Sequence, residues 1–228
     1  MIFLEANRNL TLITTPTWNG IEVQTEKGPL VHEYLESIFN VLNRSLEKHP
    51  RTAVFRFDLR FPQVGYVPDE GELTRFFQSL KAQIAADDAR KLRFEQRFHR
   101  TEIRFVWARE HNTSQNWHYH VAVMVNRDRF NTLGRIKKAC DYLDGDSPLS
   151  VGSINFADRL RKAWASSLRM NLVSSVGLVQ LCGLKIIDRN KSNFPVAFND
   201  AFFVLSYLAK SYSKIYGNHV RNFGCSRI

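Results

Sequence analysis

Two histidines separated by one residue lie in the segment NWHYHVAVMVN, residues 116 to 126. Side chains of a β-strand alternate between two faces, so His118 and His120 would project from the same face and could share one metal ion. On a helix the same pair would point to nearly opposite sides. The neighbouring residues favour a strand, because every second residue from Tyr119 to Val125 is apolar.

The preceding segment, TEIRFVWARE at residues 101 to 110, alternates in the same way. If the two segments pair as an antiparallel hairpin centred near Ser114, a carboxylate and two imidazoles gather on one face while the apolar faces match. The predicted cross-strand pairs are Glu110 with His118, Ala108 with His120, Trp107 with Val121 and Phe105 with Val123. A register shifted by two residues is the alternative.

Two imidazoles and one carboxylate form a ligand set for a divalent cation that leaves coordination positions open. The set of Glu110, His118 and His120 suits Mn²⁺ or Mg²⁺ when water and phosphate oxygens complete the shell, and it also accepts Zn²⁺. Alternatively, both histidines are surface groups of a half-exposed sheet. The cupin pattern requires a glutamate shortly after the pair, which is missing. A zinc lyase would need a third histidine, and the available ones are His99, His111 and His219.

The C-terminal segment SYLAKSYSK contains a second group of polar side chains. It belongs to a predicted helix over residues 199 to 217, on which Tyr207, Lys210 and Lys214 share one face. Taken without the histidine strand, Tyr207 reads as a core aromatic of an amphipathic helix. Tyr212 lies on another helical face.

Another alternating segment, TAVFRFDLRFP at residues 52 to 62, predicts a strand with a polar face that carries Arg56, Asp58 and Arg60. From this face Asp58 could orient a histidine or approach the metal. It could equally form an ion pair with one of the two arginines across the sheet. The sequence leaves both interpretations open.

The 228-residue chain carries a formal net charge of +10 and has a pI of about 9.7. This excess indicates an anionic partner, most commonly nucleic acid, although a membrane surface or simple solubility is an alternative. Three widely spaced cysteines without a CxxC pair argue against a disulfide framework and favour a reducing cytoplasm. No signal peptide or apolar run of transmembrane length is present, so we expect a soluble protein that is not exported and has no membrane partner.

The order of predicted elements indicates an α+β fold with a central, mainly antiparallel sheet flanked by helices. Residues 1–50 are predicted to form an N-terminal hairpin and helix packed on a domain of residues 51–228, in one compact unit. The predicted elements are a hairpin at 9–25 with a turn at Asn19-Gly20, helices at 30–48, 69–91, 127–143, 154–170 and 199–217, and strands at 52–62, 101–110, 116–126 and 177–188.

Together these motifs resemble those of the HUH endonucleases, which are rolling-circle replication initiators and relaxases. The chain is most similar to the prophage-borne YagK/YfjJ group and its relatives, the inovirus-type replication initiators. The motifs that carry the resemblance are VWARE at 106–110, NWHYHVAV at 116–123 and SYLAK at 206–210, with FRFDLRFP and LVQLCGL similar as well. The resemblance covers most of the chain and implies a split βαβ core of the ferredoxin or RRM type.

The resemblance also implies a reaction. Glu110, His118 and His120 would hold a divalent ion at the scissile phosphate. The oxygen of Tyr207 would attack the phosphorus of single-stranded DNA, leaving a free 3′-OH and a 5′-phosphotyrosine. Lys210 would position the phosphate or the tyrosine oxygen. The second candidates for these two roles are Tyr212, since some relatives use two tyrosines, and Lys214, while Asp58 is a second candidate at the metal.

The implied partners are single-stranded DNA or an origin hairpin, together with a host helicase and replication proteins. Candidate DNA-binding residues are Arg56, Arg60 and Arg104 on the polar sheet face, Arg159, Arg161 and Lys162 on the penultimate helix, and Trp117 or Tyr66 for base stacking. The alternative functions are a non-catalytic DNA-binding prophage regulator with the same fold and a zinc hydrolase or lyase that uses the HxH strand.

Overall fold

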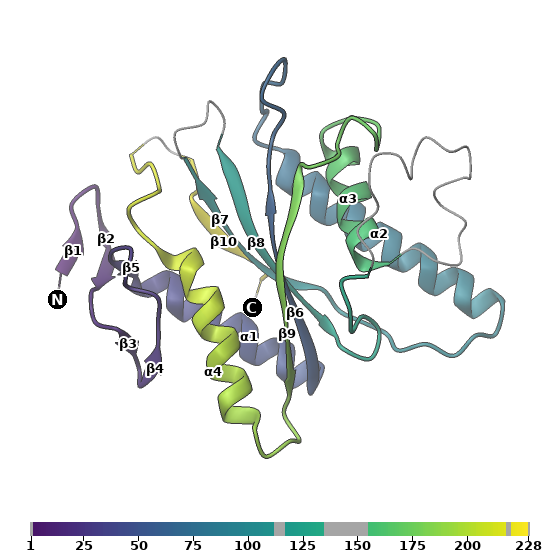
Figure 1. The fold of residues 1–228 in the computed structure, drawn as a ribbon, viewed down its shortest axis with the longest axis horizontal. Coiled ribbons are helices and arrows are strands. Elements are labelled where there is room, and N and C mark those ends of the chain that lie inside the picture. The colour runs from purple at the N-terminus through teal and green to yellow at the C-terminus, as the bar shows by residue number, and fades with distance from the viewer. Residues whose placement is uncertain (1, 112–116, 135–154, 218–219, 228) are drawn as a thin grey trace.

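A five-stranded antiparallel sheet with helices on both faces forms the centre of the protein (Figure 1). The structure is a computed structural model that describes residues 2–111, 117–134, 155–217 and 220–227. The strand order is β10-β7-β8-β6-β9. The strands are β6 (Arg51–Leu59), β7 (Arg104–Glu110), β8 (His118–Asn126), β9 (Val179–Asp188) and β10 (Phe223–Cys225).

Four α-helices in the described ranges cover this sheet, two on each face. The helices are α1 (His32–Lys48), α2 (Glu72–Arg93), α3 (Phe156–Ser167) and α4 (Phe194–Ser206). Figure 1 shows α2 and α3 on one side of the sheet and α1 and α4 on the other. The order β6-α2-β7-β8-α3-β9 is that of a split βαβ unit. The predicted α+β class with a mainly antiparallel sheet is therefore confirmed.

The alternation of β6 explains why both faces of the sheet are buried. Phe55 and Phe57 join a core with α2 and α3, whereas Val54 joins a second core with α1 and α4. Arg56 and Asp58, on the same face as Val54, are also buried. The polar face predicted for this strand is present, but only Arg60 is exposed, while Arg56 and Asp58 are buried and Arg56 lies 5.9 Å from the ring centre of Tyr207.

The predicted N-terminal hairpin is only partly correct. A tight turn at Asn19 and Gly20, both with positive φ, joins β3 (Thr17–Trp18) to β4 (Ile21–Glu22). The residues before this turn do not extend the hairpin: β2 (Asn7–Ile13) pairs with β1 (Ile2–Leu4) and β5 (Leu30–Val31). Pro16 interrupts the strand between β2 and β3, since its nitrogen cannot donate to a ladder.

The helix predicted over residues 127–143 is wrong for its described part. Residues 127–134 form turns after β8, and residues 135–143 lie outside the described residues, as does Ser114. The side chain of Asn126 accepts the backbone N–H of Asp128 at 2.9 Å, and its carbonyl accepts the N–H groups of Arg129 and Phe130. This Asx turn competes with helix initiation, which the apolar spacing does not reveal.

No helix in the described ranges combines the length and the apolar character needed to cross a bilayer.

His49 at the end of α1 gives the fold a pH-dependent contact. Its Nε2 accepts the backbone N–H of Glu102 at 2.9 Å, and burial lowers the pKa of His49 from its usual 6.5, with the charges of Lys48 and Arg104 adding to this effect. The unfolded chain therefore binds the proton first as the pH falls. We expect the free energy of unfolding to decrease below about pH 6.5, and to decrease by less in His49→Gln. Urea denaturation at pH 5 to 8 measures this, with the exposed His99→Gln as the control.

Candidate metal centre and tyrosine site

The β7–β8 pairing brings the predicted metal ligands together. Glu110 lies opposite His118, and the pairs Ala108–His120, Trp107–Val121 and Phe105–Val123 follow in the same register. The predicted register is confirmed in all four pairs. It is fixed because a one-residue slip would move every apolar side chain to the wrong face of the sheet.

Nitrogen and oxygen atoms of Glu110, His118 and His120 all lie within 4.8 Å of one another. His120 Nε2 is 2.8 Å from Glu110 Oε2 and 3.2 Å from His118 Nε2. The second carboxylate oxygen, Oε1 of Glu110, is buried and makes no hydrogen bond. A cation between these atoms would satisfy this oxygen, so the residues fit a divalent metal ion. Within the described residues His99 and His111 do not join the group, and His219 lies outside the described part.

Two side chains of β6 contact the Nδ1 atom of His120, on the side of the ring away from Glu110. Asp58 Oδ1 lies 2.6 Å from His120 Nδ1, and Arg56 contacts both groups through Nη1 and Nη2. A proton on Nδ1 that is donated to Asp58 leaves the lone pair of Nε2 free to bind a metal. Both interpretations of Asp58 therefore hold in the structure, since it contacts the histidine and pairs with Arg56.

This arrangement predicts a measurable role for Asp58. We expect Asp58→Asn to weaken Mn²⁺ binding by roughly 10- to 100-fold, because the amide orients His120 less strongly than the carboxylate does. Isothermal titration calorimetry measures the affinity. Asp200→Asn, at an exposed position on α4, is the matched control and should bind Mn²⁺ like the wild type. Equal affinities of the two variants would contradict this role.

The surroundings of Glu110 and His118 favour the protonation states in which these side chains can bind a metal ion. Burial alone would raise the pKa of Glu110, but its contacts with His120, Lys214 and Lys210 lower it to about 2. Burial lowers the pKa of His118 to about 4. Near neutral pH the carboxylate is therefore ionised and His118 is neutral, as metal ligation requires.

The predicted C-terminal helix ends much earlier than expected. Helix α4 stops at Ser206, a short 3₁₀ turn covers Tyr207–Ala209, and Lys210 is extended and forms an isolated bridge with Leu30. The N–H of Ser211 donates to the carbonyl of Pro29 at 3.0 Å. Hydrogen bonds to this distant segment replace the helical ones, so the prediction that one helical face carries the tyrosine and both lysines is wrong.

Tyr207 and Lys210 nevertheless meet beside the candidate metal ligands. Lys210 Nζ donates to the Tyr207 hydroxyl at 2.6 Å and lies 2.5 Å from Glu110 Oε2. The rings of Tyr207 and His120 meet edge to face with centroids 5.2 Å apart. Burial alone would lower the pKa of Lys210, but its contacts with Glu110 and Tyr207 raise it, so the ammonium is charged. The Tyr207 phenol, the Lys210 ammonium and the candidate metal ligands Glu110 and His120 therefore form one chain of contacts.

Lys214 and Tyr212, the second candidates for the roles of Lys210 and Tyr207, have different surroundings. Lys214 is buried, and its Nζ donates to the carbonyls of Leu208 and Lys210, which the end of the helix leaves without helical partners. Burial lowers the pKa of Lys214 to about 7. Tyr212 is half exposed, and Lys210 Nζ lies 5.4 Å from its ring centre. Lys214 therefore stabilises the non-helical segment that follows α4, and Tyr212 lies beside the site.

The basic residues predicted to bind DNA are not gathered at one place. Arg56 is buried against Asp58 and His120, while Arg60 is exposed and its charge helps to lower the pKa of His118. Arg104 pairs with Glu102 at 2.8 Å and is six residues from Glu110, about 20 Å along the strand. Of these three, the structure brings Arg56 and Arg60 to the site, and their contacts with DNA stay predictions.

The other predicted DNA-binding residues lie on the opposite face of the sheet. Arg159 on α3 is buried and pairs with Asp87 of α2, and Arg161 and Lys162 follow it on the same helix. Tyr66 donates to Glu72 and stacks on Phe61, and Arg109 lies over the ring of Trp117. The sheet therefore lies between α3 and the candidate metal ligands, and the contacts of these residues with DNA stay predictions.

Comparisons with known proteins support the resemblance to the YagK/YfjJ group that the sequence motifs indicated. Residues 13–226 match the family described as the YagK/YfjJ C-terminal domain. An uncharacterized protein of Escherichia coli (strain K12), YagK, is 30% identical over 90% of this chain and 97% of its own length; a second one, YfjJ, is 29% identical over 89% and 98%. No solved structure matches the chain. With almost its whole length matched, the chain belongs to the YagK/YfjJ C-terminal domain family.

Proposed function

We propose that the protein nicks single-stranded DNA and transfers the strand through a 5′-phosphotyrosine, initiating rolling-circle replication of a phage or mobile element in the cytoplasm of its bacterial host. One observation supports this proposal above the others. The Tyr207 hydroxyl contacts Lys210, Lys210 contacts Glu110, and Glu110 contacts His120. An unbroken chain of contacts therefore links the proposed nucleophile to the proposed metal ligands.

In this proposal each residue of the group has a defined task. Glu110, His118 and His120 hold a divalent cation, Mn²⁺ or Mg²⁺ with Zn²⁺ as the alternative, and when bound it supplies positive charge at the scissile phosphate. Lys210 donates to the oxygen of Tyr207 and stabilises the negative charge that develops there.

The reaction is a transesterification. The oxygen of Tyr207 forms a bond to phosphorus while the bond from phosphorus to the 3′-oxygen breaks. Tyr207 loses one proton and the released 3′-oxygen gains one, so no other reactant is consumed. Because the phosphotyrosine keeps a phosphodiester bond, the strand can later be resealed, while the free 3′-OH primes synthesis with host helicase and replication proteins.

An oligonucleotide assay tests this proposal. Single strands and hairpins from the DNA that flanks the gene are incubated with the protein and Mn²⁺, Mg²⁺ or EDTA, and the products are separated on a denaturing gel. We expect a covalent protein–DNA band that needs the metal. Salt-sensitive binding without cleavage of any such substrate would support a DNA-binding regulator instead. Stoichiometric zinc without DNA affinity would support a zinc hydrolase or lyase.

A further inference from the structure

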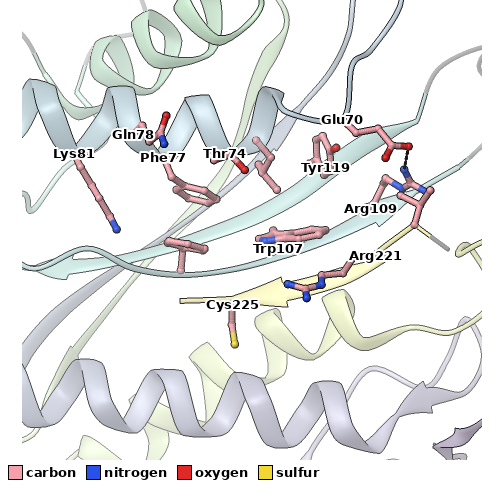
Figure 2. A pocket seen from close by; sticks show the side chains of 13 residues that line it. Glu70, Thr74, Phe77, Gln78, Lys81, Trp107, Arg109, Tyr119, Arg221 and Cys225 are labelled. Atoms are coloured by element: carbon pink, nitrogen blue, oxygen red, sulfur yellow. Dashed lines mark ion pairs between the residues drawn. The ribbon is translucent and has the colours of Figure 1, made fainter. Parts of the chain in front are cut away.

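A hollow lies on the face of β7 that points away from the metal centre, between α2 and β10 (Figure 2). Its volume is about 540 Å³, within the range of ligand pockets. Consecutive residues of β7 face opposite sides of the sheet, so Arg109 lines this hollow while Glu110 belongs to the metal centre. The hollow is therefore a separate site on the same strand.

Aromatic rings of β7 form one wall of the hollow. Phe105 and Trp107 are both partly exposed, although most large aromatic side chains of the sheet are buried. Phe105 stacks on Phe77 of α2, and the rings of Trp107 and Tyr119 are nearly perpendicular, with their centroids 5.8 Å apart. These neighbours fix the orientation of both rings.

Gly224 of β10 allows the Trp107 ring to lie against the edge strand. The two residues are directly opposite each other in the β10–β7 pair. A Cβ at position 224 would lie 2.7 Å from two carbon atoms of the indole ring, so any other residue would push the ring away. One side of the ring thus rests on backbone, and it borders the hollow as Figure 2 shows.

The charges around the hollow are mainly positive. Lys81 of α2 and Arg221 are exposed, and Lys81 Nζ lies 5.8 Å from the centre of the Phe105 ring. The only acidic residue among those that line the hollow is Glu70, which Arg109 approaches to 3.7 Å (Figure 2). Exposed cations beside partly exposed aromatic rings are the combination that binds unpaired nucleotides, through phosphate contacts and base stacking.

The hollow continues in both directions along β7. A smaller hollow of about 240 Å³ shares Glu70 and Arg109 with it and reaches Trp117. A larger one of about 730 Å³ shares Lys81 and Phe105 and reaches Arg104. Three adjacent hollows that share lining residues, two of them lined by a tryptophan, fit an extended polymer better than a small molecule.

We propose that this surface, with Trp107, Lys81 and Arg221 at its centre, is a binding site for single-stranded DNA. A base stacks on Trp107, and the neighbouring phosphates pair with Lys81 and Arg221. Paired bases of a duplex cannot reach a ring in this recess, so the site selects unpaired strands. The binding needs neither the metal nor Tyr207, and it can be correct even if the protein cleaves no DNA.

Fluorescence anisotropy of the full-length protein with a labelled ten-residue oligothymidylate in EDTA tests the site. We expect Lys81→Ala and Arg221→Ala each to weaken binding and to reduce the slope of log K against log salt by about 0.7. Trp107→Leu should weaken binding roughly 5- to 150-fold with the slope unchanged. Lys191→Ala removes an exposed cation outside the site and should bind like the wild type.

Circular dichroism establishes whether each variant is folded. If Trp107→Leu does not fold, Gly224→Ala displaces the ring without removing it and should weaken binding as well. A hairpin duplex of equal length should compete poorly. Unchanged affinity in folded Lys81→Ala, Arg221→Ala and ring variants would overturn the proposal, and so would equal competition by the duplex.

Discussion

Replacing Tyr207 by phenylalanine is expected to abolish the covalent protein–DNA product. The change removes one oxygen atom, which is the proposed nucleophile, and keeps the ring that packs edge to face on His120. Loss of a nucleophile costs at least about three orders of magnitude in rate. Quantifying the covalent band after incubation with Mn²⁺ and the flanking DNA measures this loss, while Mn²⁺ affinity should stay within about twofold of the wild type.

Tyr212→Phe is the matched control for this experiment. Tyr212 is half exposed and lies near the same lysine, but no hydrogen bond joins its hydroxyl to Lys210 among the described contacts. We expect this variant to form the covalent band at a nearly normal rate. Mass spectrometry of the adduct should find the nucleotide on the peptide that contains Tyr207. An adduct on Tyr212, or a full yield from Tyr207→Phe, would show that the nucleophile is assigned wrongly.

Glu110→Gln is expected to have the largest effect on stability. The Glu110 side chain is completely buried, with Lys210 Nζ at 2.5 Å, Lys214 Nζ at 3.9 Å and His120 Nε2 at 2.8 Å. Glutamine has nearly the same shape but no charge, so the buried Lys210 ammonium and the buried Lys214 side chain lose their only carboxylate neighbour among the described residues. Breaking a buried ion pair in this way costs roughly 3–5 kcal/mol. Urea denaturation in EDTA measures the free energy of unfolding.

The same substitution should also weaken Mn²⁺ binding, because it removes the only anionic ligand of the group. Calorimetry of the folded variant measures this second effect. Glu102→Gln is the control: its ion pairs with Lys48 and Arg104 are at the surface, and we expect its free energy of unfolding to change by less than about 0.5 kcal/mol. If Glu110→Gln is as stable as Glu102→Gln, the carboxylate does not balance the buried lysines.

Repeating local patterns determined much of the fold from the sequence. The α+β class, four of the five predicted helices in part or in whole, and the β7–β8 register follow from periods of 3.6 and 2 in the apolar residues. The candidate metal ligands were predictable for the same reason, since Glu110, His118 and His120 belong to one hairpin. The apolar pattern excludes a slip of one residue, and the structure shows that the pairing is not shifted by two.

Contacts between distant segments decided the rest. A helical pattern continues beyond Ser206, but bonds from Lys210 and Ser211 to the segment before α1 end the helix there. Arg56 looked like a surface cation because its partner His120 lies on another strand, 64 residues away. The aromatic hollow also depends on β10 lying beside β7. A periodic pattern records which face of an element is apolar, and it carries no information on which distant backbone or side-chain groups will compete for its hydrogen bonds.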